Sequence, residues 1–461
     1  MTKKISLGFT LTLLASLLVG CGSSGNDEET TYPEAYLQFY NGSANSSSTS
    51  LYVDDSLLGT SAFGDATGLG TLTTDEISLE FRRTDANNQS VVVKSLTASL
   101  QEGYKTIYVL SGDYADADFE QFSFEREDLS EHFRLLATSV VTGTPQYDVY
   151  MAEEGAPFSD AHLVVKASYQ TLEEATYWAP DPNTDSNPSD DFDLDSYVIY
   201  LTLPGESEPI YESPSISFLY STEYLMVVRN TAGALRNNLN IDLIVNSTSI
   251  SSYADINASS QFRLYNSLDQ DSPLTVSVGG NAANDTVIAL SANSLSEFTQ
   301  LEYGDYRLSA TLGSGAVTPL ANRLLTLNQG ESKAVVLYAN NDNQLKSLAF
   351  IESSLPQNYD HEIKVANLVQ DFSDIELYFV RSDETIETAK YKLSSIDYEE
   401  SRSIVLPQDY YEIVAVYDDG SGNELLLDRT SAINFNEEAN YIVTIEKTAS
   451  TNSGYVLSIL H

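Results

Sequence analysis

Short stretches in which apolar and polar residues alternate recur along the whole chain, separated by polar loops. Alternation with a period of two predicts half-buried β-strands. Two such stretches joined by a polar loop occur four times, at 36–41 with 50–53, 133–138 with 147–150, 261–266 with 274–278, and 361–367 with 375–379. Four copies of one pattern predict a tandem array of similar modules.

Two later landmarks place the four copies in register. A strand midway through each copy has apolar residues at matching offsets, so that Tyr306 and Leu308 in the third copy match Tyr411 and Ile413 in the fourth. Before the closing strands, one apolar position is held by Leu100, Phe218, Leu327 and Phe435. About seven short strands in roughly 100 residues is the size of an immunoglobulin-like sandwich. We therefore predict an all-β protein with four tandem immunoglobulin-like antiparallel β-sandwich domains.

The same register gives domain boundaries. We predict a signal peptide at 1–20, a flexible tether at 21–34, and sandwich repeats at 35–130, 131–258, 259–358 and 359–461. Polar joints around 128–131, 249–258 and 354–360 separate the repeats, and each repeat is expected to own its core. The second repeat also contains a long acidic insertion at about 152–194.

The paired strands of the second and third copies resemble a known family. Phe133-Arg134-Leu135 followed by Tyr147-Asp148-Val149-Tyr150 is similar to the opening of the bacterial extracytoplasmic family catalogued as domain of unknown function 4397. The first and fourth copies match only in pattern, since the arginine is replaced by Gln38 and Lys364. The resemblance implies a sandwich fold and a surface lipoprotein context. It supplies no catalytic residues.

The N-terminus indicates where the protein is delivered. Lys3 and Lys4 precede a short apolar stretch that ends in Leu18-Val19-Gly20-Cys21, and Cys21 is the only cysteine of the chain. This run resembles the lipobox of bacterial lipoproteins, which implies cleavage after Gly20 and a lipid anchor on Cys21. In that family an aspartate after the cysteine usually retains the protein at the inner membrane. Gly22 occupies that place, so we expect an outer-membrane lipoprotein, facing either the periplasm or the cell surface.

Charge narrows the range of partners. The chain carries 67 acidic and 23 basic residues, a formal net charge of −44. Such a field repels nucleic acid, so we expect no nucleic-acid partner. The acidic residues are interspersed among apolar strand positions, which favours a soluble folded surface over disorder.

The acidic insertion holds the candidate site residues. Asp181, Asn183 and Asp185 have the alternating spacing that lets side-chain oxygens converge on a hard cation, which predicts a weak Ca²⁺ site. An EF-hand would need a glycine where Ser186 stands and a glutamate where Phe192 stands, so a solvated acidic loop stays open as the alternative. Thermal melting of the second repeat in calcium and in magnesium separates the two interpretations. A calcium site predicts a larger rise in melting temperature with calcium, and a solvated acidic loop predicts equal shifts.

Trp178 begins this acidic run and is the only tryptophan. An aromatic ring beside acidic residues is suited to stacking on a sugar, so Trp178 with Asp181, Asn183 and Asp185 is the candidate ligand loop. The chain has four histidines, no G-x-S-x-G motif and no H-E-x-x-H motif. We therefore expect that the protein is not an enzyme and that it has no cofactor apart from the weakly bound calcium. We expect a lipoprotein that displays tandem β-sandwich modules at the outer membrane. The modules would bind an unknown protein or glycan, or they would have a structural role in the cell envelope. A carbohydrate-binding accessory protein or an enzyme that uses the Trp178 loop is the alternative.

The anchor is directly testable. Cys21→Ala removes the thiol that would take the lipid, so the variant should stay an uncleaved precursor and leave the outer-membrane fraction. Cell fractionation with immunoblotting measures this. A variant that still sediments with the outer membrane would mean that another feature anchors the chain.

Overall fold

The computed structural model describes residues 34–74, 76–85, 89–127, 129–178, 191–236, 238–246, 250–280, 285–421, 423–436 and 439–461. These residues form β-strands and three single-turn 3-10 helices, at Tyr114–Asp116, Phe158–Asp160 and Gly233–Leu235. No α-helix occurs among them. The predicted all-β class is confirmed.

The strands build four modules, and each module is a sandwich of two sheets with the same strand order. We call the sheet that contains the first strand of a module its contact sheet, and the other its outer sheet. In module 1 the contact sheet consists of β4 (Asp65–Ala66), β5 (Gly70–Thr73), β1 (Glu34–Asn41), β8 (Tyr104–Ser111) and β9 (Asp118–Glu125). The outer sheet consists of β3 (Ser56–Ser61), β2 (Thr49–Val53), β6 (Glu76–Thr84) and β7 (Ser90–Ser99).

Module 2 repeats this order and adds one edge strand. Its contact sheet consists of β13 (Glu173–Glu174), β14 (Asp191–Asp193), β10 (His132–Ser139), β18 (Glu223–Asn230), β19 (Leu239–Ile244) and the added β20 (Ile250–Ala254). Its outer sheet consists of β12 (His162–Ser168), β11 (Gln146–Glu153), β15 (Ser196–Thr202), β16 (Tyr211–Glu212) and β17 (Ile216–Ser217).

Modules 3 and 4 follow the same plan. The contact sheet of module 3 consists of β24 (Ser294–Leu295), β25 (Thr299–Leu301), β21 (Ser260–Asn266), β28 (Ser332–Ala339) and β29 (Leu345–Ile351), and its outer sheet of β23 (Thr286–Leu290), β22 (Leu274–Gly279), β26 (Gly304–Leu312) and β27 (Leu320–Leu327). The contact sheet of module 4 consists of β33 (Ser401–Pro407), β30 (Asp360–Asn367), β37 (Ile442–Lys447) and β38 (Tyr455–Leu460), and its outer sheet of β32 (Tyr391–Ile396), β31 (Ile375–Val380), β34 (Tyr410–Asp418), β35 (Glu424–Arg429) and β36 (Ile433–Asn434).

One strand pair in each module is parallel. The first strand of every contact sheet lies parallel to the strand that follows the outer sheet in sequence, in the pairs β1–β8, β10–β18, β21–β28 and β30–β37. The neighbouring pairs, such as β8–β9 and β2–β6, have the antiparallel arrangement that the sequence predicts. The chain that connects the two parallel strands forms the outer sheet of the same module. Both strands of the parallel pair therefore belong to one module.

An asparagine at the end of the first strand explains part of the repeated sequence pattern. Asn41, Asn266 and Asn367 are fully buried. The amide of Asn266 donates to the Ser291 carbonyl at 2.8 Å, and that of Asn367 donates to the Ile396 carbonyl at 3.0 Å. The side-chain oxygen of each asparagine also accepts a backbone N–H two residues later. These bonds satisfy the backbone where the chain leaves the strand. Module 2 has Ser139 at this place, and its hydroxyl accepts from the Val141 amide.

Each module has its own hydrophobic core between its two sheets, as expected. The register residues lie there: Leu100, Phe218, Leu327 and Phe435 are all buried. Burial of each such side chain contributes about 1.5–3 kcal/mol relative to exposure.

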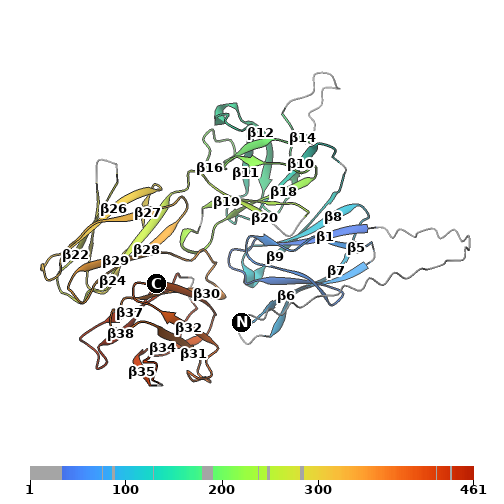
Figure 1. The fold of residues 1–461 in the computed structure, drawn as a ribbon. Helices are drawn as coiled ribbons and strands as arrows, with labels where there is room; N and C mark the ends of the chain where they lie inside the picture. The colour runs from blue at the N-terminus through green and yellow to red at the C-terminus, as the bar shows by residue number, and fades with distance from the viewer. Residues whose placement is uncertain are drawn as a thin grey trace, which may run out of the picture.

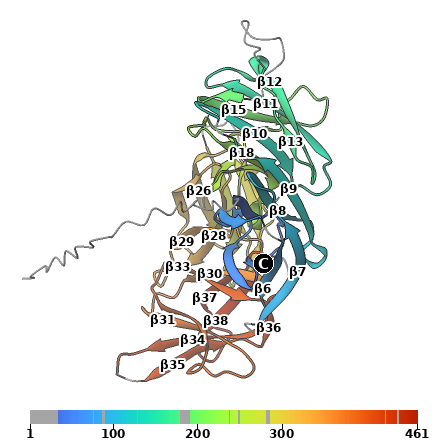
Figure 2. The same ribbon diagram turned by 90° about the vertical axis from the view of Figure 1, so that its right-hand side faces the viewer.

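The modules also share cores with one another, which the sequence analysis did not predict. The contact sheets of modules 1 and 2 pack face to face through Tyr40, Ile107 and Val109 on one side and Leu225 and Val227 on the other. The contact sheets of modules 3 and 4 pack in the same way, through a cluster that joins Tyr265, Ala334, Val336, Tyr338 and Phe350 to Ala366, Leu368 and Ile442. The modules therefore form two pairs. In Figure 1 they surround a common centre, in the order blue, green, gold and red, and Figure 2 shows modules 2 and 4 at opposite ends of the molecule.

Polar bonds fix the register within each pair. Asp242 of module 2 is fully buried. It accepts from the Tyr40 hydroxyl of module 1 at 2.7 Å and from Nε of Arg229 at 2.6 Å. In the other pair, the Tyr338 hydroxyl donates to Glu399 at 2.6 Å across the modules. Removal of one partner would leave a buried charge or donor unpaired, at a cost of several kcal/mol for a buried ion pair.

Lys105 is buried at the interface of modules 1 and 2. Its ammonium donates to Asn246 Oδ1 at 3.2 Å and to the Val245 carbonyl at 3.4 Å, and both acceptors belong to module 2. Burial lowers the pKa of Lys105 to about 7. Glu223 opposes this shift, and Arg126 adds to it.

The lowered pKa predicts a pH dependence of stability. Below about pH 7 the folded chain must keep a charge at Lys105. Above about pH 7 the folded chain releases the Lys105 proton while the unfolded chain retains it. The free-energy cost of burying Lys105 therefore shrinks as pH rises. Lys105→Met should therefore be more stable than the parent at pH 6, by on the order of a few kcal/mol, and this advantage should shrink by pH 9. Urea unfolding at several pH values measures the difference. Lys94→Met, at an exposed lysine of β7, is the control. A pH-independent difference for Lys105→Met would contradict the account.

Candidate functional site

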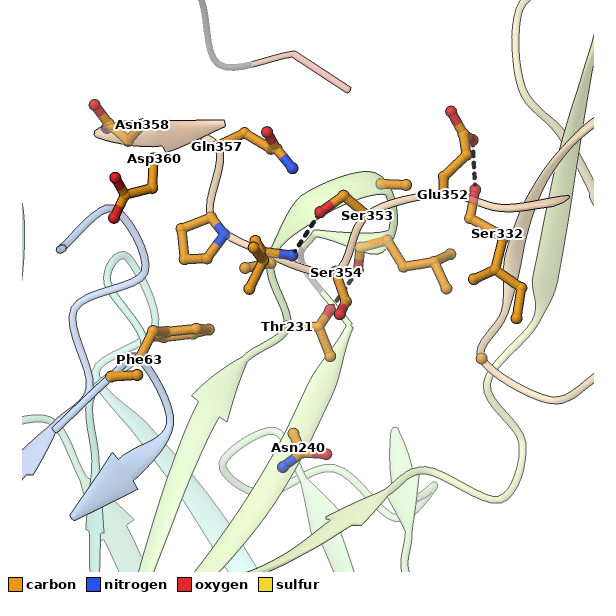
Figure 3. Close-up of a pocket in the computed structure, with 18 of the residues that line it drawn as sticks. Phe63, Thr231, Asn240, Ser332, Glu352, Ser353, Ser354, Gln357, Asn358 and Asp360 are labelled. Atoms are coloured by element: carbon orange, nitrogen blue, oxygen red, sulfur yellow. Dashed lines mark hydrogen bonds between the residues drawn. The ribbon is translucent and has the colours of Figure 1, made fainter. Parts of the chain in front are cut away.

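A cavity of about 720 Å³ lies where all four modules meet. Module 1 contributes Ser46, Ser47 and Phe63 to its wall. Module 2 contributes the loop after β18, module 3 contributes the ends of β27, β28 and β29, and the segment 353–360 leads from module 3 into module 4 along the wall. Figure 3 shows the side chains that these segments present, including Phe63, Thr231, Ser354 and Gln357. Its volume falls within the range of about 300–1,000 Å³ that is typical of ligand pockets.

Close backbone contacts hold the wall together between the two pairs of modules. The Ala234 backbone amide donates to the Ser353 carbonyl at 2.9 Å, and the side-chain Nε2 of Gln261 donates to the Ala234 carbonyl at 2.7 Å. Gly233 is required there, because its φ is +70° and a Cβ would lie 2.3 Å from the Ser353 carbonyl oxygen. A side chain at this position would push the two pairs apart.

Aromatic contacts close the arrangement between modules 1 and 4. Tyr114 of module 1 meets Tyr359, just before β30, edge to face with ring centroids 5.3 Å apart. The guanidinium of Arg83 lies 4.8 Å from the centre of the Tyr359 ring and 5.1 Å from that of Tyr114. Such aromatic and cation–π contacts stabilise an arrangement by about 0.5–1.5 kcal/mol each. The fourth module is thereby brought back to the first.

Two charged groups of the wall, Arg229 and Glu352, are each held by a buried partner of opposite charge. Arg229 is held by Asp242, and its guanidinium also lies over the Phe63 ring, 5.0 Å from its centre. Glu352 accepts from Arg263 at 2.7 Å and from the Ser332 hydroxyl at 2.9 Å. Burial raises the pKa of Glu352, while Arg263 and Ser332 oppose the shift.

Two buried polar atoms in the wall have no hydrogen-bond partner among the described residues: Nε2 of Gln357 and Oγ of Ser47. Gln357 is 1% exposed. Its Oε1 accepts the Glu362 amide at 3.0 Å, so only its donor end is unsatisfied. A buried donor without an acceptor costs about 1–3 kcal/mol. Gln357 also has a φ of +54°, a left-handed backbone that a non-glycine residue adopts at a cost.

Of the candidate residues from the sequence, the structure describes only Trp178. Asp181, Asn183, Asp185 and Cys21 fall outside the described residues, so the calcium and lipid predictions remain predictions. Trp178 is half-buried at the edge of the module 2 core. Its ring stacks on His162, with centroids 5.1 Å apart and an interplanar angle of 8°. One face of the predicted sugar platform is therefore covered.

Two other kinds of site have no candidate among the described residues. No group of three or more His, Cys, Asp or Glu side chains that could hold a metal ion occurs in the described ranges. No helix in the same ranges has the length and apolar character needed to cross a membrane.

No protein-family model and no curated protein matches the chain. Solved structures give only weak similarity. A leucine-rich repeat protein from Bacteroides thetaiotaomicron is 14% identical with a TM-score of 0.13, over 41% of this chain and 25% of that one, so this chain spans about a quarter of its length. A putative cell adhesion protein from Bacteroides fragilis is 10% identical with a TM-score of 0.11, over 42% and 84% of the two chains. A tetra-tandem repeat in the extending region of a large adhesion protein is 10% identical with a TM-score of 0.10, over 87% and 99%. Scores this low carry no argument about function.

Proposed function

We propose that the chain is a lipid-anchored binding protein of the outer membrane, and that its ligand occupies the cavity where the four modules meet. The observation that carries the proposal is that all four modules contribute to one cavity wall. Modules that moved independently on flexible joints would hold no such wall in place. The segment 354–360, which the sequence suggests is a polar joint, instead lines the cavity and buries Gln357.

The lipid anchor in this proposal rests on Cys21 and the residues before it. The anchor would keep the body at the membrane, and the acidic surface would keep it soluble and discourage anionic partners. The cavity is a better candidate for the binding site than the Trp178 loop, because His162 covers one face of the Trp178 ring.

The proposal predicts that filling the cavity abolishes binding. Ser354 is an exposed residue of the wall, so Ser354→Trp should place a large ring in the cavity without disturbing a core. Residues 22–461, carrying all four modules, would be applied to glycan and peptide arrays. We expect the bound array members to lose at least about tenfold in signal with Ser354→Trp.

Ser95→Trp is the matched control, because Ser95 is an exposed serine on β7 and is not part of the cavity wall. It should leave the array pattern unchanged. Equal binding by the parent and by Ser354→Trp would place the ligand site elsewhere and overturn the proposal.

A further inference from the structure

We infer that the ligand of the central cavity is a neutral oligosaccharide, and that Gln357 and Ser47 are two of the groups that recognise it. This inference rests on the proposed function, since it assigns a chemical class to the ligand of that cavity. Its first support is that two residues lining the cavity carry unsatisfied buried groups, the side-chain N–H₂ of Gln357 and the hydroxyl of Ser47.

The two atoms call for complementary partners. Gln357 Nε2 can only donate, and the Ser47 hydroxyl can donate or accept. A hydroxyl group can serve both, because it has one donor and two acceptor lone pairs. Gln357 comes from the segment between modules 3 and 4, and Ser47 comes from the loop between β1 and β2 of module 1. A ligand that satisfied both would bridge the first and last parts of the chain.

The remainder of the wall favours uncharged polar ligands. Thr231, Asn240 and Ser354 add neutral hydrogen-bonding groups, and Phe63 and Tyr359 add aromatic surface. Aromatic rings beside a few well-placed polar groups are typical of ligand pockets. A sugar suits such a pocket, because its ring can stack on an aromatic side chain while its hydroxyl groups form hydrogen bonds. The charges of Arg229 and Glu352 are already compensated by Asp242 and Arg263.

Charge disfavours the main competing classes. A nucleotide or an acidic glycan would bring negative charge to a chain with a net charge of −44. The wall also contains Glu331 and Asp360, which would repel such a ligand locally. For a cationic ligand, the buried carboxylate of Glu352 is already held by Arg263 and Ser332, and Glu331 is paired with Lys333 at 3.0 Å. Asp360 is exposed to solvent.

The test uses residues 22–461 and isothermal titration calorimetry. The probes are four neutral tetraoses, namely maltotetraose, cellotetraose, mannotetraose and N-acetylchitotetraose. Tetragalacturonate is the acidic comparison. We expect at least one neutral tetraose to bind and tetragalacturonate not to bind. Gln357→Glu keeps the oxygen that accepts the Glu362 amide but replaces the donor with a carboxyl oxygen, so it should weaken binding at least about tenfold.

Two further variants keep the test decisive. Ser47→Ala removes the second group without introducing a buried charge, and it should also weaken binding by several-fold. Gln344→Glu makes the same chemical change as Gln357→Glu, at an exposed residue outside the cavity wall, and should have no effect. Unchanged affinity in both Gln357→Glu and Ser47→Ala would overturn the inference.

Failure of the inference can be told apart from failure of the proposed function. If tetragalacturonate or an array peptide binds and Ser354→Trp abolishes that binding, the cavity is a binding site and the neutral-sugar assignment is wrong. If a tetraose binds equally well to Ser354→Trp, both proposals fail. Absence of binding by all four neutral tetraoses also overturns the assignment.

Discussion

The face-to-face packing of contact sheets is the interaction on which the rest of the structure depends. In each pair of modules, the strands at the centre of the contact sheet are covered on both faces, by the outer sheet of their own module and by the contact sheet of the partner module. Asp242 and Tyr40 add a buried polar bond that fits only one register of the two sheets. Apolar burial gives the packing its strength, and the polar bond makes it specific.

The cavity follows from that packing. The two pairs meet through the backbone bond from Ala234 to Ser353, through the side chain of Gln261 and through the aromatic contacts of Tyr359. They leave a cavity at the centre that is lined by both apolar and polar side chains, and Gln357 is buried there with an unsatisfied donor. Buried groups without partners are rare in folded proteins and usually have an explanation. A bound ligand that carries hydroxyl groups, as we propose, would satisfy both Gln357 and Ser47.

Much of the fold could be predicted from the sequence because each strand has one face in a core. Period-two alternation around Leu79 in module 1 and Leu308 in module 3 marks equivalent strands, β6 and β26. The sequence also contains a signal for the pairing of modules. The stretches 107–110, 225–228 and 334–338 are continuously apolar, which is typical of strands buried on both faces.

The candidate site could not be predicted in the same way. The polar part of the cavity wall consists largely of serine, asparagine and glutamine residues from distant loops, and such residues are common in any surface loop. Only their meeting in space gives them meaning. Trp178 stood out because it is unique in the sequence, but its ring packs on His162 at the edge of a core. Rarity in a sequence therefore says little about exposure of a side chain.

The central claim is that paired modules form one cooperative body, and Trp178 can test it directly. It is the only tryptophan and it lies in module 2, so its fluorescence during urea unfolding reports that module alone. Leu79→Ala weakens the core of module 1 by about 2–5 kcal/mol, and Leu308→Ala is the equivalent change in module 3, outside the pair. The account predicts that Leu79→Ala lowers the urea midpoint of the Trp178 transition, and that Leu308→Ala lowers it much less. A Trp178 transition that Leu79→Ala leaves in place would contradict the account.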